Sequence, residues 1–171
     1  MAWTTPATFT TGEAVTAAKM NAQVRDNLGF LYGAKVASVG AISTANVPSA
    51  TWTLINYAFE VVDTIGAWTA GQPSRFTPPV AGYYLVTTSV AWSADATETG
   101  YRSCRLWVNG TTLYDQDVRP AMNATQQTKA QRVIYFNGAT DFVETQVYHT
   151  KGSDHALSTT GQYSDLIWIG A

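Results

Sequence analysis

Two groups of side chains in this sequence have the chemistry of metal ligands. Asp115 and Asp117 are two residues apart, which places both carboxylates on the same side of an extended strand. Calcium takes roughly six to eight oxygen ligands, and two carboxylates supply too few. His149 and His155, with Asp154, flank the segment HTKGSDH, but zinc sites need about three or four well-spaced ligands. We therefore predict no metal and no cofactor at either place, and interpret them as a solvated strand face and an ordinary loop.

The motifs that mark an enzyme are missing as well. The sequence has no Gly-x-Ser-x-Gly, no Gly-x-x-x-x-Gly-Lys and no His-Glu-x-x-His. A glycosidase needs two carboxylates in one cleft, and nothing marks such a pair among Glu60, Glu98 and Glu144. Cys104 falls in an expected core strand and is interpreted as a small buried apolar group. We predict no catalytic residues, and hydrolysis of a glycan is the least favoured function.

Composition excludes further classes. Of 171 residues 46% are hydrophobic and 13% are charged, the net charge is −2, and no Lys/Arg cluster exists, so binding of nucleic acid through phosphates is not expected. The first residues have neither the basic start nor the apolar core of a signal peptide, so none is expected, and no apolar run approaches the ~20 residues that span a bilayer. A single cysteine excludes an intramolecular disulfide. We expect a protein that folds in a cytoplasm and does not insert into membranes.

The first 35 residues form a region of their own. Residues 1–12 are polar and Thr-rich, which predicts an extended arm. The only helical period in the chain follows, with apolar residues at positions 20, 24, 28 and 31. Either Thr10 with Glu13, or Thr16 alone, can cap the start of this helix, and Gly33 ends it. An isolated helix of this length is marginal in water, so its stripe must pack on its own domain, on copies of itself or on a partner.

From residue 36 to residue 171 the pattern is β throughout. The predicted strands are 36–43, 51–60, 82–92, 101–109, 112–118, 131–136, 141–149 and 163–169. Turn signals separate them, among them Asn109-Gly110 and Asn137-Gly138, which suit hairpin turns with positive φ. This pattern predicts an all-β domain, a sandwich, jelly roll or barrel.

The predicted strand 82–92 is apolar or aromatic on both of its faces. Tyr84, Val86 and Trp92 fall on one side, and Tyr83 and Leu85 on the other. The predicted strand 101–109 likewise has large or apolar side chains on both faces: Cys104, Leu106 and Val108 fall on one side, and Tyr101, Arg105 and Trp107 on the other. Packing between subunits explains a second buried face, whereas single surface aromatics are the plainer alternative.

Two tryptophans in or beside expected loops are candidates for stacking on sugar rings. Trp68 lies in GAWTAGQPS and Trp92 precedes SADATETG. Both also suit an anchor in the core or at an interface. Loops 93–100, 119–130 and 150–162 are the expected contact surface, since recognition sits on loops of rigid β scaffolds.

The β region resembles the superfamily of tumour necrosis factors and complement globular heads. RFTPPVAGYYLV is similar to its Phe-x-x-Pro-x-x-Gly-x-Tyr signature, at Phe76, Pro79, Gly82 and Tyr84, and RLWVNG, GATDFVETQVYH and SDLIWIGA resemble later strands. The resemblance covers residues 40–171 and implies a TNF-like jelly roll assembled as a homotrimer around a three-fold axis. The residues expected at the trimer interface are Tyr83, Tyr84, Leu85 and Trp107.

The N-terminal region resembles the opening segment of tailed-bacteriophage virion proteins. PATFTTGEAVTAAKMNAQVRDNLGFL matches the pattern Gly-Glu-x-Val-x-Ala-Ala followed by Asn-x-x-x-Arg-Asp-Asn-x-x-x-Leu. This implies a structural protein of the virion, assembled in the bacterial host cytoplasm, with residues 1–35 as attachment segment and trimer stalk and residues 36–171 as head. The expected attachment residues are Trp3, Met20, Asn21, Val24, Arg25, Leu28 and Leu31.

The resemblance implies phage capsid or tail proteins as partners and leaves several roles open. A capsid decoration protein or head fibre is favoured by the short chain, and a tail-fibre or baseplate component that contacts the host comes next. The alternative is a receptor-binding or carbohydrate-binding adhesion module whose ligand is a host cell-surface glycan.

Overall fold

The computed structural model describes residues 4–41, 46–97 and 99–171. The chain divides into two compact units, residues 1–34 and 35–171, next to the boundary predicted after residue 35. Among the described residues, no helix has the length and apolar character needed to cross a membrane.

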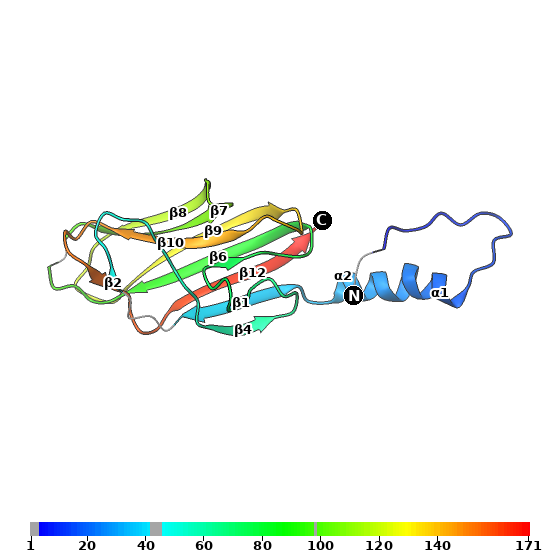
Figure 1. The fold of residues 1–171 in the computed structure, drawn as a ribbon, viewed down its shortest axis with the longest axis horizontal. Helices are drawn as coiled ribbons and strands as arrows, with labels where there is room; N and C mark the ends of the chain where they lie inside the picture. Colours follow the sequence, from blue (N-terminus) through cyan, green and yellow to red (C-terminus); the bar gives the residue numbers. More distant parts are fainter. Residues whose placement is uncertain (1–3, 42–45, 98) are drawn as a thin grey trace. The chain divides into compact units, whose positions relative to one another are not determined.

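The N-terminal unit is an extended arm followed by a helix (Figure 1). The helix consists of α1 (Ala17–Met20), a π-helical segment (Asn21–Asp26) and α2 (Asn27–Tyr32). Of the two predicted caps, Thr16 is the one used, because its Oγ1 accepts a hydrogen bond from the Lys19 amide at 3.2 Å.

The other unit is a sandwich of two antiparallel sheets (Figure 1). The first sheet has the order β4–β1–β12–β6–β9, with β1 Val36–Ala41, β4 Phe59–Asp63, β6 Gly82–Trp92, β9 Gln126–Phe136 and β12 Gln162–Gly170. The second has the order β3–β10–β7–β8, with β3 Thr53–Leu54, β7 Tyr101–Val108, β8 Thr112–Pro120 and β10 Val143–His149. In addition β5 (Arg75–Phe76) pairs with β10, and β2 (Asn46–Val47) pairs with β11 (His155–Ala156). The all-β prediction is confirmed.

The alternation predicted for the two doubly apolar strands is confirmed. Along β6 buried and exposed residues alternate from Gly82, so that Tyr84 and Val86 enter the core while Tyr83 faces outward. In β7, Cys104 and Leu106 are buried between the sheets. Burial raises the pKa of the Cys104 thiol to about 12, which keeps it protonated and unreactive near neutral pH.

The segment predicted as one strand, 51–60, is instead two strands in different sheets. β3 pairs with β10 of the second sheet, and β4 pairs with β1 of the first. Between them Ile55 and Tyr57 point into the core, and their amides donate to the carbonyls of Thr145 and Pro73. The apolar run therefore marks a crossing between the sheets.

One of the two Asn-Gly pairs makes the predicted hairpin. Asn109 and Gly110 both have positive φ and join β7 to β8. Asn137-Gly138 does not, because β9 and β10 belong to different sheets. There the Asn137 side chain accepts hydrogen bonds from the amides of residues 139, 140 and 141 and holds a wider turn.

The Phe-x-x-Pro-x-x-Gly-x-Tyr segment leads the chain into β6. Phe76 is buried, and the Tyr84 hydroxyl donates to the Val80 carbonyl at 2.8 Å. Gly82 has a φ of 139°, and a Cβ there would lie 2.4 Å from both the Gly170 carbonyl oxygen and Nε1 of Trp168. This position therefore requires glycine.

Two buried histidines lie around Trp92 at one end of the sandwich. The His155 ring stacks on Trp92 with centroids 5.9 Å apart, and the His149 ring meets Trp92 edge-on at 5.7 Å. The Nε2 atom of His149 lies 2.8 Å from the Val47 carbonyl oxygen, while its Nδ1 accepts from the Lys151 amide. This arrangement requires the neutral ring, with its proton on Nε2.

A buried ion pair borders this cluster. The Arg102 guanidinium lies 2.6 Å from the Asp95 carboxylate, and the Lys151 ammonium approaches the same carboxylate at 3.2 Å. Burial opposes ionisation of Asp95, but hydrogen bonds from Thr97 and the neighbouring Lys151 hold the pKa of its carboxyl below the usual value. The charges that face the histidines are therefore the cations Arg102 and Lys151 and the carboxylates of Asp95 and Asp154.

We predict that the sandwich loses stability as the pH falls below about 6.5, the usual histidine value. Burial and the nearby cations lower the pKa of both His149 and His155 in the folded chain. The unfolded chain therefore binds protons first, and the stability present above this pH is lost as the pH decreases. Urea unfolding at pH 7.5 and at pH 5.5 measures the effect.

The chain has only these two histidines, so a double variant isolates their contribution. In His149→Gln with His155→Gln, the free energy of unfolding should change much less between the two pH values. An unchanged pH dependence in the double variant would contradict this origin.

Candidate subunit-contact face

The outer face of the first sheet carries a group of large apolar side chains that nothing in the described chain covers. Each of them is between 43% and 54% exposed. They are Tyr83, Val133, Tyr135, Tyr163, Ile167 and Ile169. We call this surface the first-sheet face.

Strand register gathers these residues around β6. Tyr83 lies opposite Tyr135 of β9, with ring centroids 5.3 Å apart in an edge-to-face arrangement. Leu85 lies between Val133 of β9 and Ile167 of β12. Such cross-strand pairs of aromatic and branched side chains stabilise a sheet and form a continuous apolar surface.

A polar row crosses the same face. Ser38, Asp165, Thr87 and Gln131 are register partners in β1, β12, β6 and β9. The Ser38 hydroxyl donates to the Asp165 carboxylate at 2.5 Å. The first-sheet face is therefore apolar around Tyr83 and Leu85 and polar along this row.

The apolar part is large enough to support association. Complete burial of one large apolar side chain is worth about 1.5–3 kcal/mol, and roughly half of each of these six is still exposed. Covering them is worth on the order of 5 kcal/mol per protomer before the costs of association.

The structure separates the four residues predicted at a trimer interface. Tyr83 and Leu85 lie on the first-sheet face, as predicted. Tyr84 does not, because its side chain is buried between the sheets, where burial raises the pKa of its hydroxyl to about 12. Trp107 belongs to β7 and faces outward from the second sheet, beside Arg105. The prediction for Tyr84 is therefore wrong, because a side chain buried between the sheets cannot contact another subunit, whereas the interface role of Trp107 stays a prediction.

Sequence reasoning missed the partners of Tyr83 on this face. Val133 and Tyr135 alternate with buried Ile134 and Phe136 in β9. Residues 163, 165, 167 and 169 alternate in the same way in β12. The alternation of these residues is visible in the sequence. Only the strand order of the folded sheet shows that β9 and β12 lie on either side of β6.

Neither tryptophan proposed for ligand contact presents an open ring. Trp92 is completely buried and its indole N–H donates to Thr128 at 3.2 Å, so its prediction as a ligand contact is wrong. Trp68 is half-buried against the core, and its indole N–H donates to the Pro73 carbonyl at 3.1 Å. Trp68 therefore acts as an anchor for its loop.

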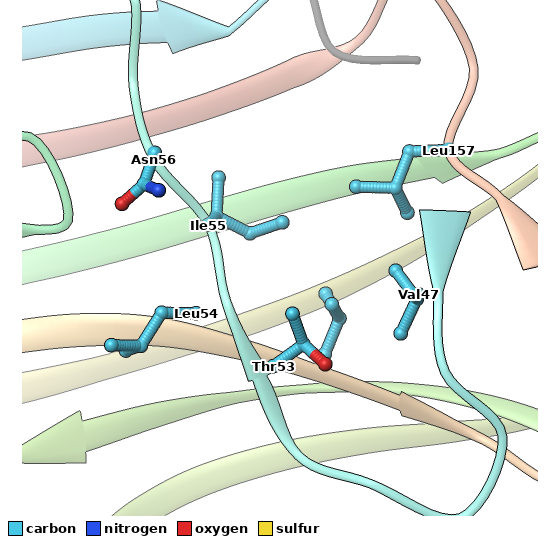
Figure 2. Close-up of a pocket in the computed structure, with 7 residues that line it drawn as sticks. Val47, Thr53, Leu54, Ile55, Asn56 and Leu157 are labelled. Atoms are coloured by element: carbon cyan, nitrogen blue, oxygen red, sulfur yellow. The ribbon is translucent and has the colours of Figure 1, made fainter. Parts of the chain in front are cut away.

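Two pockets formed by described residues of the β unit have few charged lining residues. Figure 2 shows one of about 120 Å³ where the crossing segment with Thr53, Leu54 and Ile55 meets Val47 and Leu157. None of its lining residues is ionisable. A second pocket, of about 280 Å³, has Arg75 as its one charged lining residue.

Asp115 and Asp117 join the edges of the two sheets. The Asp115 carboxylate accepts a hydrogen bond from the Gln131 amide at 2.7 Å, and that of Asp117 accepts from the Lys129 amide at 2.8 Å. These amides belong to β9, the edge strand of the first sheet, while the aspartates belong to β8 of the second. No group of three metal-ligating side chains occurs in the part of the chain that the structure describes.

The apolar stripe of the N-terminal helix is exposed within its own unit. Its members are between 43% and 50% exposed: Met20, Val24, Leu28 and Leu31. Of the polar attachment candidates, Asn21 is exposed, and Arg25 pairs with its neighbour Asp26 at 2.7 Å. Trp3 lies outside the described residues.

Two side-chain amides hold the arm against this helix. Asn27 accepts from the Thr4 amide at 2.9 Å and donates to the Thr4 carbonyl at 2.8 Å. Gln23 accepts from the Ala7 amide at 2.8 Å. Asn27, one of the residues that match the phage pattern, thus fixes the arm.

Comparison with known proteins identifies the fold. No protein-family model and no curated protein matches the sequence. Among solved structures, the β unit is similar to murine APRIL, with a TM-score of 0.61, 13% identity, and coverage of 80% of this chain and 99% of that chain. It is also similar to the globular domain of zebrafish complement 1qA, with a TM-score of 0.59, 13% identity, and coverage of 79% and 97%.

The β unit has a TNF-like jelly-roll fold. A third solved structure agrees: Eiger TNF from S. frugiperda has a TM-score of 0.55 at 14% identity, covering 80% of this chain and 93% of that chain. The predicted fold class is thus confirmed. At this level of identity the likeness concerns the fold alone.

We predict that Asn27→Ala releases the arm. The variant loses two hydrogen bonds to Thr4, and each is worth about 1 kcal/mol, so the Thr4 amide should exchange its hydrogen roughly thirtyfold faster. Hydrogen exchange followed by NMR measures this. Asn21→Ala is the matched control, because Asn21 is exposed and should leave the exchange rate unchanged. Equal rates in both variants would contradict the role of Asn27.

Proposed function

We propose that this chain is a homotrimeric structural protein of a tailed-phage virion. Residues 1–35 anchor it to the particle, and the jelly roll is displayed on the surface. Decoration of the capsid, or a head fibre, is the favoured role, and a component of the tail fibre or baseplate is the next. The first-sheet face is the observation that carries the proposal, since a face this apolar needs a partner and copies of the same chain supply one.

The fold supports a three-fold arrangement of these faces. The resemblance to tumour necrosis factors and complement heads implies that the sheet containing β6 lines the axis. Tyr83, Tyr135 and Ile167 would then pack against neighbouring subunits, whereas the polar row with Asp165 would meet polar groups or water.

The N-terminal helix supports the same assembly. Positions 20, 24 and 28 are four residues apart, and four residues exceed one α-helical turn of about 3.6 residues. The wider π-helical segment between them offsets this excess, so that Met20, Val24 and Leu28 stay on one face. Three such stripes can pack as a short stalk, or each can dock on a virion protein.

A second candidate function is recognition of a host-surface glycan by the head. It rests on the tryptophan, tyrosine and arginine side chains on the outer face of the second sheet.

We predict that Tyr83→Glu combined with Leu85→Glu dissociates the trimer. The two carboxylates would be buried without partners at the axis, at a cost of several kcal/mol per protomer. Analytical ultracentrifugation should give a trimer for the parent chain and a monomer for the variant at micromolar concentration. Val118→Glu, on exposed β8 of the other sheet, is the control and should remain trimeric.

A parent chain that sediments as a folded monomer would overturn the proposed assembly. A dimer would retain the contact face but exclude the three-fold axis.

We predict that deletion of residues 1–31 leaves a soluble trimeric head that no longer joins particles. The deletion removes the exposed helical stripe, whereas the β unit keeps its own core. Quantitative mass spectrometry of purified particles measures incorporation and copy number. Hundreds of copies per particle indicate the capsid and a handful indicate the tail, while undiminished incorporation of the truncated chain would contradict the anchor.

A further inference from the structure

A stack of aromatic rings and one guanidinium lies on the outer face of the second sheet. Arg105 of β7 lies between two indoles, with its central carbon 3.8 Å from the centroid of Trp52 and 3.9 Å from that of Trp107. Tyr148 extends the stack from Trp52 at 5.0 Å, and Tyr101 follows at 5.8 Å. We call this group the arginine stack.

The Arg105 guanidinium is fixed along one edge. Its Nε and one of its terminal nitrogens, Nη2, donate to the side-chain oxygen of Gln146, at 2.8 Å and 2.5 Å. A guanidinium has five N–H groups, so three remain without an acceptor in the described chain. These include the end formed by Nη1 and Nη2, a fork that matches two carboxylate oxygens.

The charge of Arg105 is also unbalanced. On the same sheet, Arg75 stacks on Phe142 at 3.9 Å but pairs with the Glu144 carboxylate at 3.0 Å. Arg105 has only the neutral amide of Gln146, and none of the ion pairs among the described residues includes it. The chain therefore neutralises one stacked arginine and leaves the other available for an external anion.

We propose that the arginine stack binds a carboxylated sugar, with the carboxylate on the fork of Arg105 and the ring against the neighbouring aromatic side chains. The clamped guanidinium gives up little conformational entropy on binding. The flanking tryptophans and tyrosines combine apolar edges with N–H and O–H groups, which suits the alternating C–H and O–H groups of a sugar. The stack does not contain the predicted ligand contacts Trp68 and Trp92.

A sugar fits this place better than an acidic peptide. Arg105 and Gln146 lie in β7 and β10, the two inner strands of the second sheet. Their backbone groups are paired with neighbouring strands, so a peptide cannot add a strand there and would depend on side chains alone. The proposal does not require the trimer, because the stack and the first-sheet face belong to different sheets.

Titration calorimetry with the full chain tests the site, with trigalacturonate as probe and its methyl ester as the neutral counterpart. We expect binding of the acid, at least tenfold weaker binding of the ester, and weaker binding of the acid at higher salt. No binding at millimolar concentration, or equal binding of acid and ester, would overturn the proposal. Preferential binding of a glutamate-rich peptide would overturn it too and assign the face to a protein partner.

Three variants identify the residue responsible. Arg105→Gln should reduce the affinity for trigalacturonate at least tenfold, and Arg105→Lys, which keeps the charge but loses the fork, should fall between this variant and the parent. Arg132→Gln, an exposed arginine of β9 in the other sheet, is the matched control and should bind as the parent does.

Sedimentation of Arg105→Gln keeps this test separate from the proposed assembly. A trimeric variant that has lost the sugar supports the site, whereas a trimeric variant that binds normally overturns the site and leaves the assembly intact. If Arg105→Gln does not fold, Arg105→Lys tests the site in its place. An affinity for trigalacturonate equal to that of the parent chain would then exclude binding of the carboxylate by the guanidinium fork.

Discussion

Antiparallel pairing of β6 with β12 and β9 is the constraint on which the rest of the β unit depends. Side chains alternate along β6, so the register fixes which residues of both neighbours face the core and which face outward. A slip of one residue would exchange the buried Tyr84 row for the exposed Tyr83 row. Both the core and the first-sheet face are therefore consequences of the same pairing.

Much of this architecture was predictable from the sequence, and the failures have local causes. The start of β6 follows from the alternation of buried and more exposed residues that runs from Gly82 to Val90, soon after Pro78-Pro79. The first residues of β9 were missed because polar side chains occupy its inward positions: Thr128 is buried, but it accepts the indole N–H of Trp92. A polar residue type predicts exposure to solvent. A hydrogen-bond partner on a distant strand nevertheless allows a polar side chain to be buried.

The candidate surfaces were harder to predict, because two outward aromatic faces look alike in sequence. Tyr83 and Trp107 both alternate with core residues, and only the strand order places them on different sheets. Their surroundings then differ: Tyr83 lies among tyrosines and branched aliphatic residues, and Trp107 lies against a guanidinium. No spacing rule pairs Trp52 with Arg105, since the contact depends on where the crossing segment enters the second sheet.

The hydrogen bonds from β9 to Asp115 and Asp117 have a consequence for crowded copies of the chain. Unpaired amides along a sheet margin invite another molecule to add a strand, and this leads to uncontrolled polymerisation. Here two carboxylates of the opposite sheet already occupy the amides of Lys129 and Gln131. A closely spaced array of these domains, at a high local concentration, is thereby protected from fusing side by side into fibrils along this margin.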